Sequence, residues 1–127
     1  MHYCFMLFTK EAPKMEYIQK VLDPYYEETV YENYQYNEEL PILMWDWWQI
    51  DGRYSHVTND KSPILASEIP EYDSLQTFGC IDVDGTIYAR SHWNGKEIVE
   101  HPEYWDKLEA IKKRNKDCWV TILDLHD

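Results

Sequence analysis

The sequence predicts a mixed α+β fold of the ferredoxin-like, split βαβ type, with the order β-α-β-β-α-β, in a single domain that spans residues 1–127. Two observations support this prediction: four apolar runs have the composition of strands, and two segments repeat apolar residues at helical spacing. In chain order these segments are 2–8, 14–34, 77–81, 86–93, 101–116 and 118–125. For this fold we expect the strand order 4-1-3-2, with both helices on one face of an antiparallel sheet.

The first half of the chain opens on a strand and continues into a helix. Residues 2–8, HYCFMLF, are an uninterrupted apolar run, which is typical of a buried strand. The segment 14–34 has helical spacing in MEYIQKVL, and Pro24 should kink or divide that helix because proline cannot donate a backbone hydrogen bond. Residues 35–76 contain prolines and no clear period, so we expect a long irregular excursion there.

The second half carries the remaining strands and the second helix. The runs 77–81 and 86–93 flank the sequence DVDG, and Asp-Gly between two β-rich runs predicts a hairpin in which Gly85 supplies a positive φ. Residues 101–116 form an amphipathic pattern whose basic residues gather at the C-terminal end, as the helix dipole favours. The apolar run 118–125 predicts the last strand.

The stretch CIDVDGT, residues 80–86, resembles the nucleophile motif of haloacid-dehalogenase-type phosphatases. In that family the first aspartate attacks phosphorus, and a doubly wound domain supplies a hydroxyl, a lysine and an acidic pair from later βα units. Here only 43 residues follow Asp84, and the next predicted element is a strand. The sequence therefore argues against phosphatase chemistry and favours a turn.

The expected strand order would bring several strand ends to one rim of the sheet. Asp124 and His126 are two residues apart, so they point to one side of the last strand. Carboxylates and an imidazole together can bind a divalent metal. The candidate metal ligands are Asp82, Asp84, Asp124 and His126, with His2 and Asp127 nearby; a polar rim without metal is the simpler alternative, and we expect no other cofactor.

The stretch MWDWWQIDGRYSHV is the most distinctive part of the chain. Three tryptophans within four residues cannot all point to the buried side of one strand, so at least one should lie on the other face. One interpretation is an aromatic cluster that anchors the loop, with Asp46 paired to Arg53. The other is a ligand pocket in which Arg53 binds an anion between aromatic walls, with Trp45, Asp46, Trp47 and Arg53 as candidate residues.

This stretch and the C-terminal strand resemble a group of small, mostly phage- or prophage-associated proteins. The group carries W-D-W-[YW]-x-[IV]-G-G-R-[WY] in the middle and ends on a strand closing D-x-H. The matching residues are Trp45, Asp46, Trp47, Trp48, Ile50, Gly52, Arg53, Tyr54, Asp124 and His126. The chain departs from the pattern at Asp51, where the group has the first glycine of its pair. The resemblance implies a phage setting and no particular mechanism.

The net charge of −12 limits the kinds of partner. So acidic a chain should not bind nucleic acid or an anionic membrane through its overall field, and it should favour basic surfaces. Three cysteines without C-x-x-C spacing, Cys4, Cys80 and Cys118, predict reduced thiols in a cytoplasmic protein of a bacterial host cell. We expect no membrane-spanning segment, because the longest apolar runs are short.

An acidic, tyrosine-rich window has no Lys or Arg between Val21 and Gly52. A run of like charge is usually a solvated face. Acidic groups spaced among tyrosines can also imitate a phosphate backbone and occupy a basic nucleic-acid channel. The candidate partner-binding residues are Asp23, Tyr25, Tyr26, Glu27, Glu28, Tyr31, Glu32, Tyr34, Glu38 and Glu39.

Three functional hypotheses follow. The leading one is a non-enzymatic, phage-encoded inhibitor of the anti-CRISPR kind, which binds a basic host protein or a nucleic-acid-binding effector through the acidic window. The alternative is a small ligand-sequestering protein or metal-dependent enzyme that uses the Trp/Asp/Arg pocket. The third is an acidic accessory protein that forms a homodimer through its aromatic patch.

Overall fold

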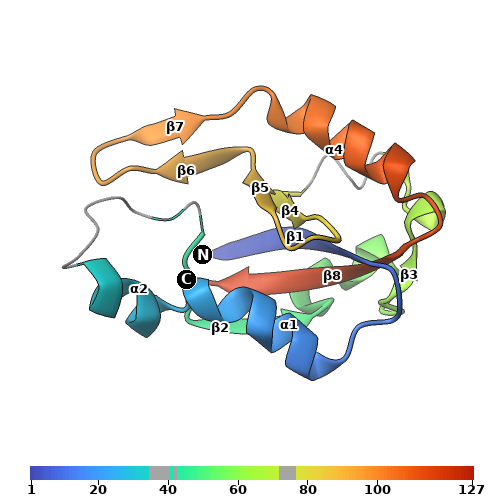
Figure 1. The fold of residues 1–127 in the computed structure, drawn as a ribbon, viewed down its shortest axis with the longest axis horizontal. Helices are drawn as coiled ribbons and strands as arrows, with labels where there is room; N and C mark the ends of the chain where they lie inside the picture. Colours follow the sequence, from blue (N-terminus) through green and yellow to red (C-terminus); the bar gives the residue numbers. More distant parts are fainter. Residues whose placement is uncertain (35–40, 42, 72–76) are drawn as a thin grey trace.

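A computed structural model describes residues 1–34, 41, 43–71 and 77–127 of the chain. Within these residues the core is a six-stranded mixed sheet built on two long strands, β1 (His2–Thr9) and β8 (Trp119–His126), which pair antiparallel over their whole length. The strand order is β2-β8-β1-β4-β5, and β3 also pairs with β8 (Figure 1). The shorter strands are β2 (Trp47–Ile50), β3 (Ile64–Leu65), β4 (Gly79–Ile81) and β5 (Ile87–Ala89).

The other elements surround this sheet. The predicted first helix is divided at Pro24, as expected, because Pro24 lies in the first turn of the 3-10 helix η1 (Asp23–Tyr25) between α1 (Met15–Leu22) and α2 (Glu27–Tyr34). The predicted second helix is present as α4 (Tyr104–Arg114). The remaining described elements are the 3-10 helices η2 (Gly52–Val57) and η3 (Ala66–Glu68) and the separate hairpin of β6 (Ser91–Trp93) and β7 (Ile98–Glu100).

The central strand β1 is buried on both faces. Its side chains alternate between two cores: Cys4, Met6 and Phe8 pack in the cluster that includes α4, whereas Phe5 and Leu7 pack in the cluster that includes α1. All five are at most 2% exposed. Helices α1 and α4 therefore lie on opposite sides of the β1–β8 pair (Figure 1). Burying each large side chain of this kind stabilises the fold by about 2 kcal/mol.

The mixed α+β class is confirmed, but the ferredoxin-like arrangement is not. The strand that follows the excursion, β4, lies parallel beside β1, and β5 lies at the sheet edge. In the order expected from the sequence these two strands would exchange places, and both helices would share one face. The composition of β1 explains the helices on opposite faces: apolar residues at both odd and even positions require cover on both faces of the sheet.

The hairpin after β4 forms as predicted, and the strand that follows it does not continue as one element. The backbone N–H of Gly85 donates to the carbonyl oxygen of Asp82 at 2.9 Å, with a φ of +86° at Gly85. The predicted strand 86–93 is divided at Arg90, where the chain leaves the sheet and begins the β6–β7 hairpin. In the described part of the chain, no helix is long and apolar enough to cross a membrane.

Candidate functional site

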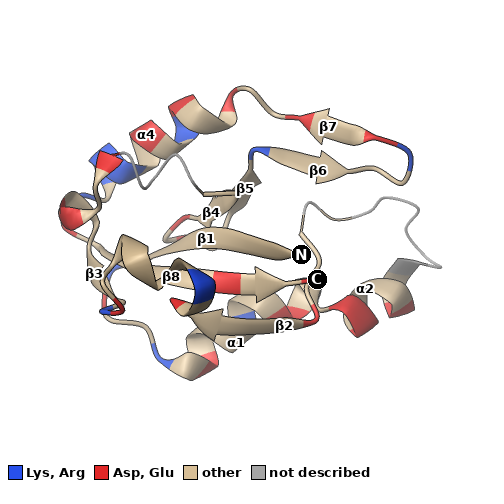
Figure 2. Ribbon diagram, turned by 180° about the vertical axis from the view of Figure 1, so that it is seen from behind, with Lys and Arg blue, Asp and Glu red and all other residues tan. Residues whose placement is uncertain are grey.

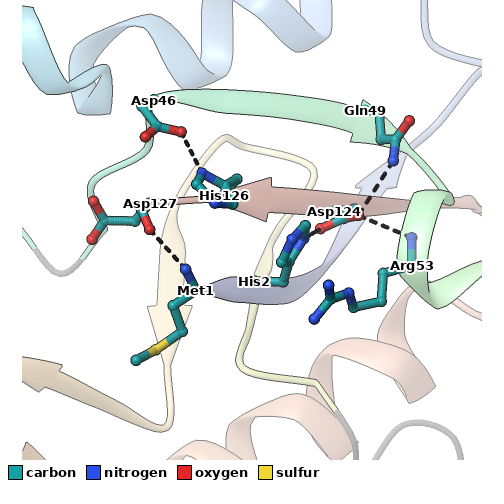
Figure 3. A network of polar contacts seen from close by, with 8 residues as sticks. All are labelled: Met1, His2, Asp46, Gln49, Arg53, Asp124, His126 and Asp127. Carbon is teal, nitrogen blue, oxygen red and sulfur yellow. Dashed lines mark hydrogen bonds and ion pairs between the residues drawn. The ribbon is translucent and has the colours of Figure 1, made fainter.

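The tryptophan-rich stretch and the C-terminal D-x-H sequence lie side by side. Strand β2 pairs antiparallel with the end of β8, in a register that places Trp47 opposite His126 and Gln49 opposite Asp124. The two halves of the sequence pattern are thus neighbours on one sheet although they are more than 70 residues apart in the chain. Figure 3 shows the hydrogen-bonded network that they form with His2 at the start of β1.

Asp124 is the centre of this network. Its side chain is fully buried, and it accepts hydrogen bonds from His2 Nδ1 at 2.7 Å and from the backbone N–H of Arg53 at 2.9 Å (Figure 3). The Gln49 amide adds a longer contact of 3.4 Å. Burial alone would raise the pKa of Asp124, but these donors outweigh it and hold the pKa of the carboxyl below its usual value. Asp124 is therefore an ionised carboxylate that fixes both the His2 ring and the Arg53 loop.

A second His–Asp pair lies next to the first. His126 Nδ1 is 2.7 Å from Asp46 Oδ1, and the rings of His2 and His126 meet edge to face with centroids 5.0 Å apart. A carboxylate can only accept, so each Nδ1 carries the proton and each Nε2 faces away from its carboxylate. In the described residues neither Nε2 has a hydrogen-bond partner. Two oriented imidazoles with available Nε2 atoms can bind a ligand or transfer a proton.

Two consecutive residues of the turn that follows β2, Asp51 and Gly52, have a positive φ. Asp51 has a φ of +58°, and its buried carboxylate accepts from Thr58 Oγ1 at 2.8 Å and from Ser62 through both its N–H and its hydroxyl. Gly52 also has a positive φ, and a Cβ there would collide with Gln49 and Asp124. Hydrogen bonds thus stabilise at Asp51 the backbone that a glycine would adopt more easily.

At least one tryptophan lies on the face away from the core, as expected: Trp47 is 48% exposed, whereas its neighbour Trp48 packs against the cluster that includes α1. Trp45 precedes β2; it is 5% exposed, and its indole N–H donates to the carbonyl oxygen of Leu22 at 2.8 Å. Among the described contacts Asp46 is paired with His126 rather than with Arg53. Because Trp45 is buried, it does not form an open wall of the expected pocket with Asp46, Trp47 and Arg53. Trp45 belongs to the core.

The four candidate metal ligands are not brought together. The parallel pairing of β4 with β1 carries the hairpin that holds Asp82 and Asp84 to the far end of the sheet from Asp124 and His126. Asp82 is buried and bonded instead to Arg114 and, at 2.9 Å, to Asn115. No group of three or more His, Cys, Asp or Glu side chains within the described ranges is placed to hold a metal ion. The expected rim was wrong for either strand order, because a strand that runs parallel to β1 ends at the opposite edge of the sheet from the C-terminal end of β8.

The acidic window is partly exposed and partly built into the core. Asp23, Glu28, Tyr31 and Glu32 are exposed, and α2 carries acidic residues without a basic one (Figure 2). Three others are half-buried; Tyr25 and Tyr26 pack against the α1-side core, and Glu27 lies at the start of α2. The Tyr34 side chain and the residues Glu38 and Glu39 lie outside the described residues.

One residue of the network, Gln49, escaped the sequence reasoning. It carries no signal in the sequence, and it reaches Asp124 only because β2 pairs with β8 in one particular register. The pairing of Asp46 with His126 was missed for the same reason. His2 lies beside Asp124 and His126, as expected. No protein-family model, curated protein or solved structure matches this chain.

Proposed function

We propose that this protein is a phage-encoded inhibitor of a host nucleic-acid-handling or defence complex, of the anti-CRISPR kind. It acts by covering a basic surface of the host protein with its acidic surface, which comprises Asp23, Glu27, Glu28, Tyr31 and Glu32. The observation that carries the proposal is the exposure of acidic side chains along η1 and α2 in a stretch from Val21 to Gly52 that holds no Lys or Arg.

The physics of such a surface suits a basic partner. Its negative charge attracts Lys and Arg over about 8 Å at physiological salt and accelerates association. Tyr31 is 55% exposed, so it offers a stiff aromatic side chain for burial against the partner. Tyr25 and Tyr26 were expected to contact the partner, but both pack against the core on the α1 side of the sheet. The Tyr26 ring lies 4.8 Å from that of Trp45 and supports the base of α2.

The test is charge reversal of the acidic surface. The triple variant Glu27→Lys, Glu28→Lys, Glu32→Lys changes the net charge from −12 to −6, since each substitution adds two positive charges. Wild-type protein should restore phage plating on a bacterial strain with an active CRISPR system, compared with the same strain lacking it. The triple variant should lose that protection, because association slows and affinity falls by about tenfold or more.

A matched control separates surface position from overall charge. The variant Glu68→Lys, Glu97→Lys, Asp106→Lys makes the same charge change at exposed positions outside the window, and it should protect as the wild type does. Circular dichroism must show that both variants are folded. If the folded window variant protects as well as the wild type, or if the wild type protects no strain, the proposal is wrong.

A further inference from the structure

A polar cavity lies beside the His2–Asp124 pair. It has a volume of about 530 Å³, and its wall comes from β1, η2, the β6–β7 hairpin and α4. The polar groups in the wall are those of His2, Tyr54, Arg90, Ser91 and Glu100. A second cavity of about 370 Å³ shares Met1, Tyr3, Phe78, Ser91 and Ile98 with the first, and its wall is mainly apolar. The five shared residues place the two cavities side by side; together they are called the cleft below, and they offer a polar part and an apolar part to an amphipathic small molecule.

Arg90 supplies a positive charge to the polar part, and Glu100 supplies a negative one. The sequence has three arginines, and Arg114 is paired with Asp82. Of the other two, Arg90 lines the cavity, and the Arg53 side chain extends from η2 toward His2 (Figure 3). Both side chains are exposed, and Arg90 lies 5.6 Å above the Phe78 ring. Arginine binds phosphate oxygens through two parallel hydrogen bonds.

His2 adds an oriented hydrogen-bonding group to the same wall. Asp124 occupies its Nδ1, so Nε2 is the ring nitrogen that remains for a ligand. Its side chain is 20% exposed, which leaves the ring accessible while the buried carboxylate fixes its orientation. The Glu100 carboxylate also lines the cavity. It would repel a phosphate placed against it, and it can accept hydrogen bonds from the hydroxyl groups of a sugar.

The apolar part of the cleft offers flat side chains. Tyr3 and Phe78 line both cavities, and their rings are in contact at a centroid distance of 4.7 Å. Trp93, on the β6–β7 hairpin, is 54% exposed and lines the apolar cavity. Aromatic walls of this kind stack against a planar ring.

We infer that this cleft binds a nucleoside phosphate. The phosphate would be held by Arg53 and Arg90, and the base by the aromatic walls. The sugar hydroxyls would donate to Glu100 and to the Nε2 atom of His2. The site is separate from the acidic surface, because none of the five residues of that surface lines either cavity.

Isothermal titration calorimetry of the full chain with adenosine 5′-monophosphate tests the inference. Adenosine and inorganic phosphate, titrated separately, report the two halves of the ligand. Arg90→Ala and Arg53→Ala should each weaken binding of the nucleotide by about tenfold to a hundredfold, as expected for the loss of a charged hydrogen bond. Lys96→Ala is the matched control, because it removes one exposed positive charge on the β6–β7 turn outside the cavity wall.

Each outcome of these titrations either supports or overturns the inference. Nucleotide binding that falls in both arginine variants and is unchanged in Lys96→Ala supports the inference. If adenosine binds as tightly as the nucleotide, the arginines do not bind the phosphate as proposed. If inorganic phosphate alone binds as tightly as the nucleotide, the aromatic walls do not bind the base as proposed. No heat at millimolar nucleotide, or an equal loss in Lys96→Ala, overturns the inference. Arg53→Ala leaves the backbone N–H that bonds Asp124, so it tests the guanidinium without removing the turn.

Discussion

Replacing Asp124 separates the contribution of its charge from that of its hydrogen bonds. In Asp124→Ala, the backbone N–H of Arg53 and Nδ1 of His2 both lose their partner. Each unsatisfied donor in a partly buried position costs about 1–3 kcal/mol. We expect a loss of about 3 kcal/mol in the free energy of unfolding and a fall of about 10 °C in Tm for a chain of this size.

Asp124→Asn should cost much less, about 1 kcal/mol, because the amide fits the same network. Its oxygen accepts from Arg53, and its NH2 group donates to His2 Nδ1 if the ring adopts the other tautomer. The Nε2 atom then becomes a donor where it was an acceptor in the neutral ring. Nitrogen-15 NMR shifts of the His2 imidazole report that exchange, and a structural change alone would not produce it.

The free energy of unfolding measured at acidic pH tests the same role of the Asp124 carboxylate. The pKa of Asp124 is lower in the folded protein than in the unfolded chain, so its carboxylate stabilises the fold at pH values above the unfolded value. That stability is lost as the pH falls through the folded pKa. Asp124→Asn should therefore show a flatter decline between neutral and acidic pH. Denaturant unfolding of the three proteins measures the effects, and equal stability of Asp124→Ala and wild type would refute the reasoning.

Two further predictions concern the turn and the thiols. Gly52→Ala should destabilise the fold by about 2 kcal/mol or more in thermal unfolding, because it adds a collision with Gln49 and Asp124 to the strain of a positive φ. Gly85→Ala, at another positive φ, meets open space and should cost only about 1 kcal/mol. Equal losses would contradict this. Burial and the charge of Asp82 raise the pKa of Cys80 to about 12. A thiol reagent at pH 8 should therefore label half-buried Cys118 first and reach Cys80 only on unfolding. Labelling of Cys80 before Cys118 in mass spectra would contradict this prediction.

The sequence predicted most elements for local reasons. Pro24 divided the first helical segment because of its missing N–H, Gly85 marked the hairpin turn, and the apolar spacing of 101–116 located α4. The uninterrupted run in β1 also held the information that both faces of this strand are buried. That information argued against a sheet with one covered face, because apolar and polar residues alternate along the strands of such a sheet.

The sequence identified candidate residues of the site but not the hydrogen bonds between them. Asp46, Arg53, Asp124 and His126 stood out as candidates from the sequence pattern. Their partners did not, because a pairing register that joins β2 to β8 is set by side-chain packing between segments far apart in the chain. The expected Asp46–Arg53 pair was wrong for that reason, since Asp46 accepts from His126 and the backbone N–H of Arg53 donates to Asp124, both on β8.

The sequence by itself determined the mixed α+β class, the positions of most helices and strands, the acidic window and the aromatic stretch. These depend on local propensity, periodicity and charge, which act over a few residues. The tertiary structure alone decided that β4 lies beside β1, that Asp82 and Asp84 are far from Asp124, and that Arg90 joins His2 at one cavity. Those facts depend on pairing between segments that lie far apart in the chain, which local propensity and periodicity do not specify.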